Sequence, residues 1–186
     1  MTSTTSRRDR EDVAVRALGL AGTRWRALGT SAQVVVTAPG RLPAAWLAVR
    51  QVLDDIDVAA SRFRSDSELA AVNRAAGHWV SVSPLLCRVV RVALVAAEET
   101  DGLVDPTVGA SLVRLGYDRT FRLVPADAPA VSLGVADVPG WQSVDLDVSC
   151  GRVRIPPDTV IDLGATAKGY AADLAAQAAE HATGCG

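Results

Sequence analysis

A long amphipathic helix between Pro43 and Phe63 is the feature of this sequence that most constrains its fold. Apolar residues recur there at steps of three and four, and charged residues take the opposite face. An apolar stripe of this kind must be buried, and we expect it to pack on a sheet. The chain of 186 residues is 49% hydrophobic and 22% charged, which excludes a disordered polypeptide and predicts one compact unit.

Short extended segments supply the strands of such a sheet. Residues 25–28 and the Val-rich residues 32–38 predict two extended segments hinged at Gly29-Thr30, and residues 79–82 predict a third strand. Between residues 144 and 155 apolar and polar residues alternate, which predicts a hairpin with one buried face. We expect a further strand at residues 159–163.

Helix-start signals precede several other segments. Ser65, followed three places later by Glu68, has the pattern of a capping box. Ser83-Pro84 places a capping hydroxyl and a first-turn proline before a nearly all-apolar helix. A last helix is expected over residues 165–182.

These elements predict an α+β fold, with mixed or antiparallel sheets flanked by helices. Residues 1–23 are interpreted as a polar N-terminal tail and residues 24–186 as the folded domain. The proline-bearing stretch 121–139 has no clear periodicity and predicts a surface excursion or a subdomain junction.

Charge and cysteine usage exclude some classes of function. The formal net charge is -2, which leaves no basic excess for nucleic-acid phosphates, so no nucleic-acid partner is expected. The cysteines, Cys87, Cys150 and Cys185, form no C-x-x-C pair and favour a reduced, cytoplasmic compartment. Neither a signal-peptide pattern nor a transmembrane segment is predicted. No G-x-S-x-G pattern accompanies the two histidines, so no hydrolase triad is expected. The sequence assigns no catalytic residue.

The segment from Ile161 to Tyr170 is the strongest candidate for chemistry. It runs through small residues into the last helix, and it carries Lys168, the only lysine of the chain. Backbone amides and the helix dipole favour an anion there, and the amine adds a full positive charge, so a phosphate-bearing ligand is expected. The alternative is a tight turn with an exposed lysine. The spacing around Lys168 does not match a Walker loop.

Three other segments have both a structural and a functional interpretation. Asp105 precedes Pro106 and is expected to be an N-cap, but it could also contact a ligand. Phe63 lies among polar residues and could be the last core residue of its helix or a stacking platform for a flat ring. Leu28-Gly29-Thr30 is expected to be a strand kink.

Four segments, taken in order, resemble the successive motifs of the FAD:protein FMN transferases, the ApbE family. They are ALGTSAQVVV, DDIDVAASRFRSDSELAAVN, ETDGLVDPTVGASLVRLGY and VIDLGATAKGYAAD. The similarity extends from about Leu28 to the end of the chain.

The resemblance implies an FAD site, and each position that matches a family contact can be named. These positions are Leu28, Phe63, Leu103, Val104, Asp105, Asp162 and Lys168. Leu28 stands where the family usually has methionine, and Phe63 matches an aromatic position against the isoalloxazine ring. Ala165 matches a residue whose main-chain carbonyl is a magnesium ligand.

The reaction implied by the resemblance is magnesium-dependent. A threonine hydroxyl of an acceptor flavoprotein attacks the FMN-side phosphorus of FAD, and AMP is released. Such phosphoryl transfer depends mostly on positioning and charge neutralisation.

Family members continue beyond the last helix of this chain with further strands and a metal-binding segment, so we expect a truncated gene product. One carbonyl, that of Ala165, cannot by itself hold a magnesium ion. An uncovered sheet edge would favour self-association. The alternatives are an FAD-binding remnant without catalysis and an inert structural fragment.

Overall fold

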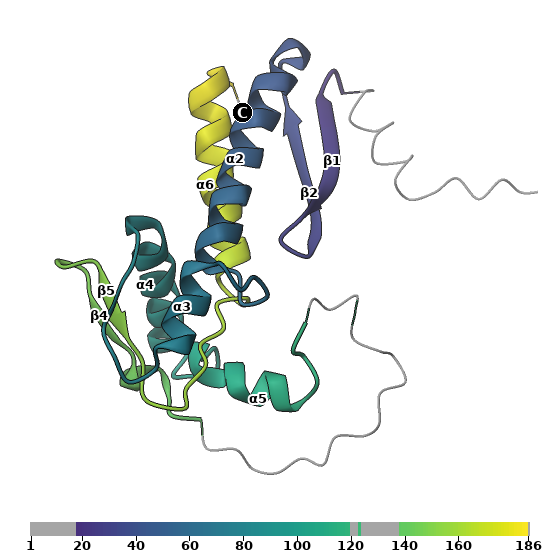
Figure 1. Ribbon diagram of the computed structural model, residues 1–186. Coiled ribbons are helices and arrows are strands. Elements are labelled where there is room, and N and C mark those ends of the chain that lie inside the picture. The colour runs from purple at the N-terminus through teal and green to yellow at the C-terminus, as the bar shows by residue number, and fades with distance from the viewer. Residues whose placement is uncertain (1–17, 120–122, 124–137, 186) are drawn as a thin grey trace, which may run out of the picture. The chain divides into compact units, whose positions relative to one another are not determined.

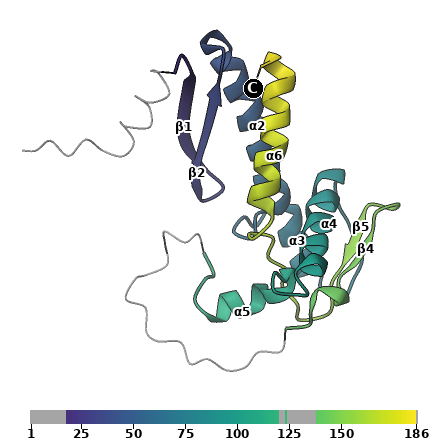
Figure 2. The ribbon, with the colours of Figure 1, turned by 180° about the vertical axis from the view of Figure 1, so that it is seen from behind.

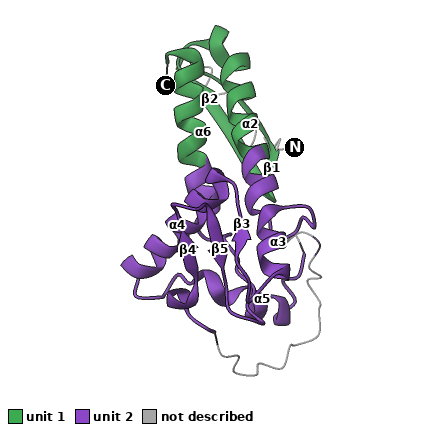
Figure 3. Cartoon of the chain, turned by 60° about the vertical axis from the view of Figure 1, so that its left-hand side comes forward, with its two compact units in different colours: residues 1–54, 172–186 green, residues 55–171 purple. Residues whose placement is uncertain are grey.

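The computed structural model describes residues 18–119, 123 and 138–185 (Figure 1). Most of the predicted tail, residues 1–23, and most of the unassigned stretch 121–139 lie outside the described residues. The chain divides into two compact units, where its length alone predicts one: unit 1 is residues 1–54 and 172–186, and unit 2 is residues 55–171 (Figure 3). Each unit has its own sheet, which accounts for the division.

Unit 1 contains a β-hairpin. Strand β1 (Ala21–Ala27) pairs antiparallel with β2 (Thr30–Val36), which confirms two extended segments here. The kink predicted at Leu28-Gly29-Thr30 is wrong, because the chain reverses there into a hairpin and Ala27 pairs with Thr30. The turn residues Leu28 and Gly29 have φ angles of 49° and 73°. A two-residue turn with positive φ at both positions matches the twist of the strands, and glycine adopts that conformation freely whereas leucine does not.

Parts of two helices, residues 42–54 and 172–183, complete unit 1, and they lie side by side there in both views (Figures 1 and 2). Helix α2 (Leu42–Ala60) follows the short 3-10 helix η1 (Pro39–Arg41) and is the predicted amphipathic helix. Helix α6 (Ala167–Thr183) is the predicted last helix. The rings of Trp25 in β1 and Trp46 in α2 meet edge to face, with centroids 6.4 Å apart, so the helix packs on the hairpin as expected.

Unit 2 combines a three-stranded antiparallel sheet with short helices. The strand order is β3-β5-β4. The elements are β3 (Val80–Ser81), β4 (Asp145–Asp147), β5 (Arg152–Arg154), α3 (Glu68–Arg74), α4 (Pro84–Glu99), α5 (Gly109–Arg114), and the 3-10 helices η2 (Pro106–Val108) and η4 (Trp141–Ser143). The predicted hairpin and the helix after Ser83 are confirmed, as is the α+β class, and both sheets that the described residues form are antiparallel.

The core of unit 2 is built mainly from apolar side chains of the end of α2, of α3, α4 and β5, and of the segment 155–163. The largest that are fully buried are Ile56, Leu69, Val72, Leu86, Val89, Val90, Val153, Ile155, Ile161 and Leu163. Among the helices of the described part of the chain, none is long and apolar enough for a bilayer crossing.

Helix α3 begins differently from the prediction. Its N-cap is Ser67, whose Oγ accepts a hydrogen bond from the Ala70 amide at 3.0 Å. Glu68 accepts instead from Ser83, through Oε2 from the amide at 2.6 Å and through Oε1 from the hydroxyl at 2.7 Å. The predicted capping box of Ser65 and Glu68 is therefore wrong, because the Glu68 carboxylate finds its donors at the start of α4.

The strand predicted at residues 159–163 is also wrong, since these residues pair with no other strand of the described chain. The Asn73 side chain replaces a strand partner. Its Oδ1 accepts from the Ile161 amide at 2.9 Å, and its Nδ2 donates to the Ile161 carbonyl at 3.1 Å. The next amide, that of Asp162, donates to the Pro106 carbonyl at 2.8 Å.

Candidate functional site

The segment that leads into α6 presents small residues and one amine to solvent. Gly164, Ala165, Lys168 and Gly169 are all exposed. The Lys168 Nζ donates to the Gly164 carbonyl at 3.2 Å, so the amine lies over the residues that precede the helix. The amides of Lys168 and Gly169 belong to the first helical turn, whose N–H groups have no intrahelical acceptor. This segment, residues 161–170, is called the junction below.

The carboxylate of Asp162 holds the backbone of the junction through a hydrogen bond. Its Oδ1 accepts from the Gly164 amide at 2.7 Å, and its Oδ2 accepts from Nε of Arg62. A Cβ at position 164 would lie 2.8 Å from Oδ1 of Asp162. The carboxylate therefore packs so closely against the turn that only glycine fits at position 164 without a shift.

Arg62 is a site residue that the sequence did not reveal. Its Nη2 donates to the Tyr117 carbonyl at 2.8 Å, and its guanidinium lies 4.6 Å from the ring centroid of Phe63 and 5.2 Å from that of Tyr117. The contact between Arg62 and Asp162 joins residues 100 positions apart. An arginine beside an aromatic residue in a loop was the available signal, but the residues near Arg62 in the sequence do not predict that it pairs with Asp162.

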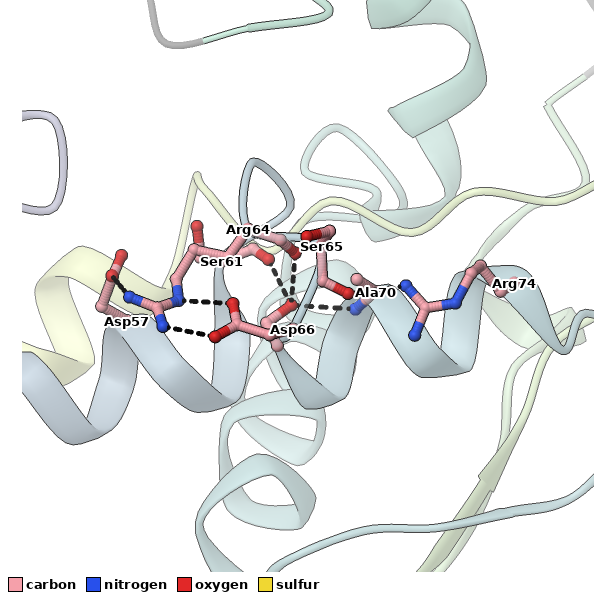
Figure 4. A network of polar contacts seen from close by, with 8 residues as sticks. Asp57, Ser61, Arg64, Ser65, Asp66, Ala70 and Arg74 are labelled. Atoms are coloured by element: carbon pink, nitrogen blue, oxygen red, sulfur yellow. Dashed lines mark hydrogen bonds and ion pairs between the residues drawn. The ribbon is translucent and has the colours of Figure 1, made fainter.

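A polar network shapes the loop between α2 and α3 that carries Arg62 (Figure 4). Arg64 donates to Asp57 at 3.1 Å and to both oxygens of Asp66 at 3.0 and 2.8 Å. Its guanidinium holds the pKa of Asp66 below the usual value for aspartate. The Ser67 hydroxyl donates to the Ser61 carbonyl at 2.6 Å. The loop so fixed buries the Arg62 side chain and leaves the neighbouring aromatic ring partly exposed.

Phe63 has the exposure expected of a stacking platform. It is 42% exposed, so the interpretation as a last core residue is wrong. Tyr117 supports its ring in a T-shaped contact, with centroids 5.4 Å apart and planes at 69°. The pair leaves part of an apolar ring open to a flat partner.

Asp105 is the predicted N-cap. Its Oδ1 accepts from the Thr107 amide at 2.7 Å and from the Thr107 hydroxyl at 2.6 Å, and its Oδ2 accepts from the Trp141 amide at 3.0 Å. Leu103 is 91% exposed, and Val104 is half-buried, with its amide donating to Thr100 Oγ1 at 3.1 Å. The structural role of Asp105 is thus confirmed, while a ligand contact stays a prediction.

The Asp105 segment and the junction meet in unit 2. The hydrogen bond from the Asp162 amide to Pro106 joins them directly. Gly109 allows this approach, because a Cβ there would lie 2.9 Å from the carbonyl carbon of Val160 and closer still to its oxygen. The structure therefore brings Phe63, Asp105, Asp162 and Lys168 into one connected region. Leu28 lies in unit 1, in the β1–β2 turn.

Metal ligands are sparse in this region. Ala165 is exposed, so its carbonyl belongs to an accessible residue. Over the described part of the chain, however, no group of three or more His, Cys, Asp or Glu side chains is placed to hold a metal ion.

Residues 28–185 match the model of the ApbE family. Two curated proteins, each named FAD:protein FMN transferase, come from Klebsiella pneumoniae and Salmonella typhimurium. Each is 31% identical to this chain, over 166 and 172 residues, and the match covers 86% of this chain and 45% of the relative. The chain thus spans about half the length of the curated relatives it matches.

Solved structures agree with this assignment. The ApbE protein of Thermotoga maritima is 28% identical, with a TM-score of 0.71 over 87% of this chain and 53% of that one. The flavin transferase ApbE of Vibrio cholerae is 21% identical, with a TM-score of 0.72 over 89% of this chain and 54% of that one. At this lower identity the second match shows the fold alone.

Proposed function

The chain belongs to the ApbE family, and from that premise we propose that it binds FAD and acts in transferring the FMN moiety of FAD to a threonine of an acceptor flavoprotein. In that reaction the threonine hydroxyl gives up its proton to solvent as its oxygen forms a bond to the FMN-side phosphorus. The bond from that phosphorus to the bridging oxygen breaks, and AMP leaves with that oxygen. The two curated relatives carry the name of this activity.

The junction is the observation that carries the proposal. Its exposed small residues let a diphosphate approach the backbone, and the helix start offers amides and a positive dipole end. The Lys168 amine, held over Gly164, adds a full charge at the same place. These groups would bind the diphosphate of FAD and neutralise charge on it during phosphoryl transfer.

Of the remaining predicted contacts, Phe63, Leu103, Val104 and Asp105 are proposed for the other parts of FAD. The exposed ring of Phe63 would stack on the isoalloxazine, and Leu103 and Val104 would give it apolar neighbours. Asp105 can accept a further hydrogen bond, because each carboxylate oxygen has two lone pairs and Oδ2 accepts one hydrogen bond from the Trp141 amide. Leu28 is proposed as an apolar flavin contact on the basis of the resemblance alone.

Magnesium is proposed only through the Ala165 carbonyl. A hard cation of this size requires about six oxygen ligands, and the described residues assemble no carboxylate group for it. These residues do not fit a complete magnesium site, so the chemistry assigned here to the chain uses its amides and Lys168.

The acceptor is proposed to be a flavoprotein with a target threonine, and a cytoplasmic location remains a prediction from the cysteine pattern. Self-association is proposed through the β1–β2 hairpin, because in the described residues each of these strands pairs on one side only. Sedimentation at several protein concentrations tests it, and a monomer throughout would contradict it.

Titration of FAD by quenching of flavin fluorescence tests the proposed function. We expect the parent chain to bind FAD and Lys168→Gln to raise the Kd about tenfold, the loss of about 1.4 kcal/mol for one charge contact. Arg91→Gln removes an equal charge from an exposed position on α4 and should leave the Kd unchanged.

Two results would contradict the proposal. A parent chain that binds no FAD would favour an inert fragment, and equal affinity of Lys168→Gln and parent would place the diphosphate elsewhere. AMP release in the presence of FAD, magnesium and an acceptor then separates a transferase from a chain that only binds flavin.

A further inference from the structure

Arg62 is a buried charge that the proposed FAD contacts leave unexplained. Its side chain is 7% exposed, and that of its partner Asp162 is 12% exposed. Removing charges from water is unfavourable unless hydrogen bonds compensate for the lost solvation. Arg62 finds them on two segments, at the Asp162 carboxylate and at the Tyr117 carbonyl.

The guanidinium contacts two different kinds of group at once. Its edge donates to Asp162, which also holds the Gly164 amide of the junction. Its plane lies over Phe63 and within reach of the Tyr117 ring, at 4.6 and 5.2 Å from the centroids. A lysine could not reproduce this arrangement, because its ammonium has neither a planar face nor a fork of donors.

We propose that Arg62 is a positioning residue that couples the two parts of the FAD site, the junction for the diphosphate and the Phe63 platform for the isoalloxazine. The inference rests on the proposed function. Arg62 acts through its neighbours: it neutralises Asp162 and supports the Phe63 ring.

Charge is the first part of this role. Asp162 lies directly beneath the Gly164 turn, where the diphosphate is proposed to bind. Without Arg62 its carboxylate would lose its ion-pair partner beside a second anion. At about 6 Å and an effective dielectric constant of about 40, that repulsion weakens binding about tenfold. Asp162→Asn should then relieve most of the loss, since an amide carries no charge.

The second part of the role of Arg62 is support of the Phe63 ring, and a different ligand tests it. Riboflavin carries the isoalloxazine without phosphate, and ADP carries a diphosphate without the flavin. Arg62→Lys keeps the charge beside Asp162 but removes the planar contact with Phe63. It should therefore retain ADP binding and weaken riboflavin binding by a few-fold, about the value of one cation–π contact.

The experiment measures the Kd of FAD, ADP and riboflavin for the whole chain and its variants. Arg62→Gln is expected to raise the Kd of ADP and FAD about tenfold. Arg62→Gln combined with Asp162→Asn is expected to bring the ADP value back to within about threefold of the parent, without restoring riboflavin binding. An unpaired Asp162 carboxylate would also destabilise the fold, and Asp162→Asn would relieve that loss as well. The Kd values are therefore compared only between variants whose urea midpoint and near-ultraviolet circular dichroism match those of the parent.

Arg152→Gln is the matched control. Arg152 also pairs with an aspartate, Asp147 at 2.9 Å, and also lies over an aromatic ring, Trp79 at 4.7 Å. Its loss should leave all three Kd values at the parent level, and near-ultraviolet circular dichroism verifies that each variant is folded.

The outcomes separate the two hypotheses. A parent that binds no FAD contradicts the proposed function itself. If the parent and Arg62→Gln bind FAD with equal affinity, only the role of Arg62 is contradicted. Failure of Asp162→Asn to restore ADP binding overturns the charge argument. Should Arg62→Gln fail to fold, Arg62→Lys decides: equal losses of ADP and riboflavin binding would overturn the division of roles.

Discussion

Gly109 lies where two segments of the site approach most closely. A Cβ added there would lie 2.9 Å from both the carbonyl carbon and the Cγ1 of Val160. Real Cβ atoms do not approach backbone this closely, so Gly109→Ala must push the Val160 backbone away. The shift would strain the hydrogen bond between Asp162 and Pro106. We expect overpacking of this kind to lower the free energy of unfolding by about 2 kcal/mol.

Urea unfolding followed by tryptophan fluorescence measures this loss. With a slope of about 2 kcal/mol per molar, the midpoint should fall by about 1 M. Gly169→Ala is the matched control, because no atom lies within 4 Å of a Cβ at that helical position and alanine should stabilise the helix by about 0.5 kcal/mol. A midpoint of Gly109→Ala equal to that of the parent would refute the close-approach argument.

Two further predictions concern groups around the site and on the hairpin of unit 2. Asn73→Ala leaves the buried Ile161 amide and carbonyl without their partners and should lower the unfolding free energy by about 2 to 3 kcal/mol, and a midpoint within error of the parent would contradict this. Hydrogen bonds from Ser149 and Cys150 hold the pKa of Asp147 below its ordinary value. Its contribution to stability is therefore complete at neutral pH, begins to fall below the ordinary aspartate pKa of about 4, and is lost only as the pH falls through the lowered pKa of the folded chain. The difference in Tm between parent and Asp147→Asn should be smaller at pH 3 than at pH 6, and a constant difference would show that the charge is irrelevant.

Much of the fold was predictable because its signals are local. Serine before proline at position 83 gave the start of α4, and Asp105 before Pro106 gave the cap of η2. Each depends on residues within one helical turn of each other, so the sequence contains the whole interaction. The amphipathic stripe of α2 required only a regular spacing and an apolar surface to receive it.

The errors arose where a local pattern competed with a distant partner. Glu68 has the spacing of a capping box with Ser65, but the two donors of Ser83 hold it instead. Residues 159–163 have the alternation of a strand, and their side chains obey it, yet the Asn73 side chain takes the place of a neighbouring strand. Contacts of this kind, between residues far apart in the sequence, cannot be predicted from local patterns.

The candidate site divides in the same way. The sequence by itself determined the features on which the proposed anion binding depends, because small residues, a helix start and Lys168 are consecutive. Only the tertiary structure decided that Asp162 is neutralised by Arg62 and that Phe63 is supported by Tyr117. The physical reason is range: helix dipoles, caps and periodicity act within a turn or two, whereas the pairing of a buried charge depends on which distant segment the packed core brings beside it.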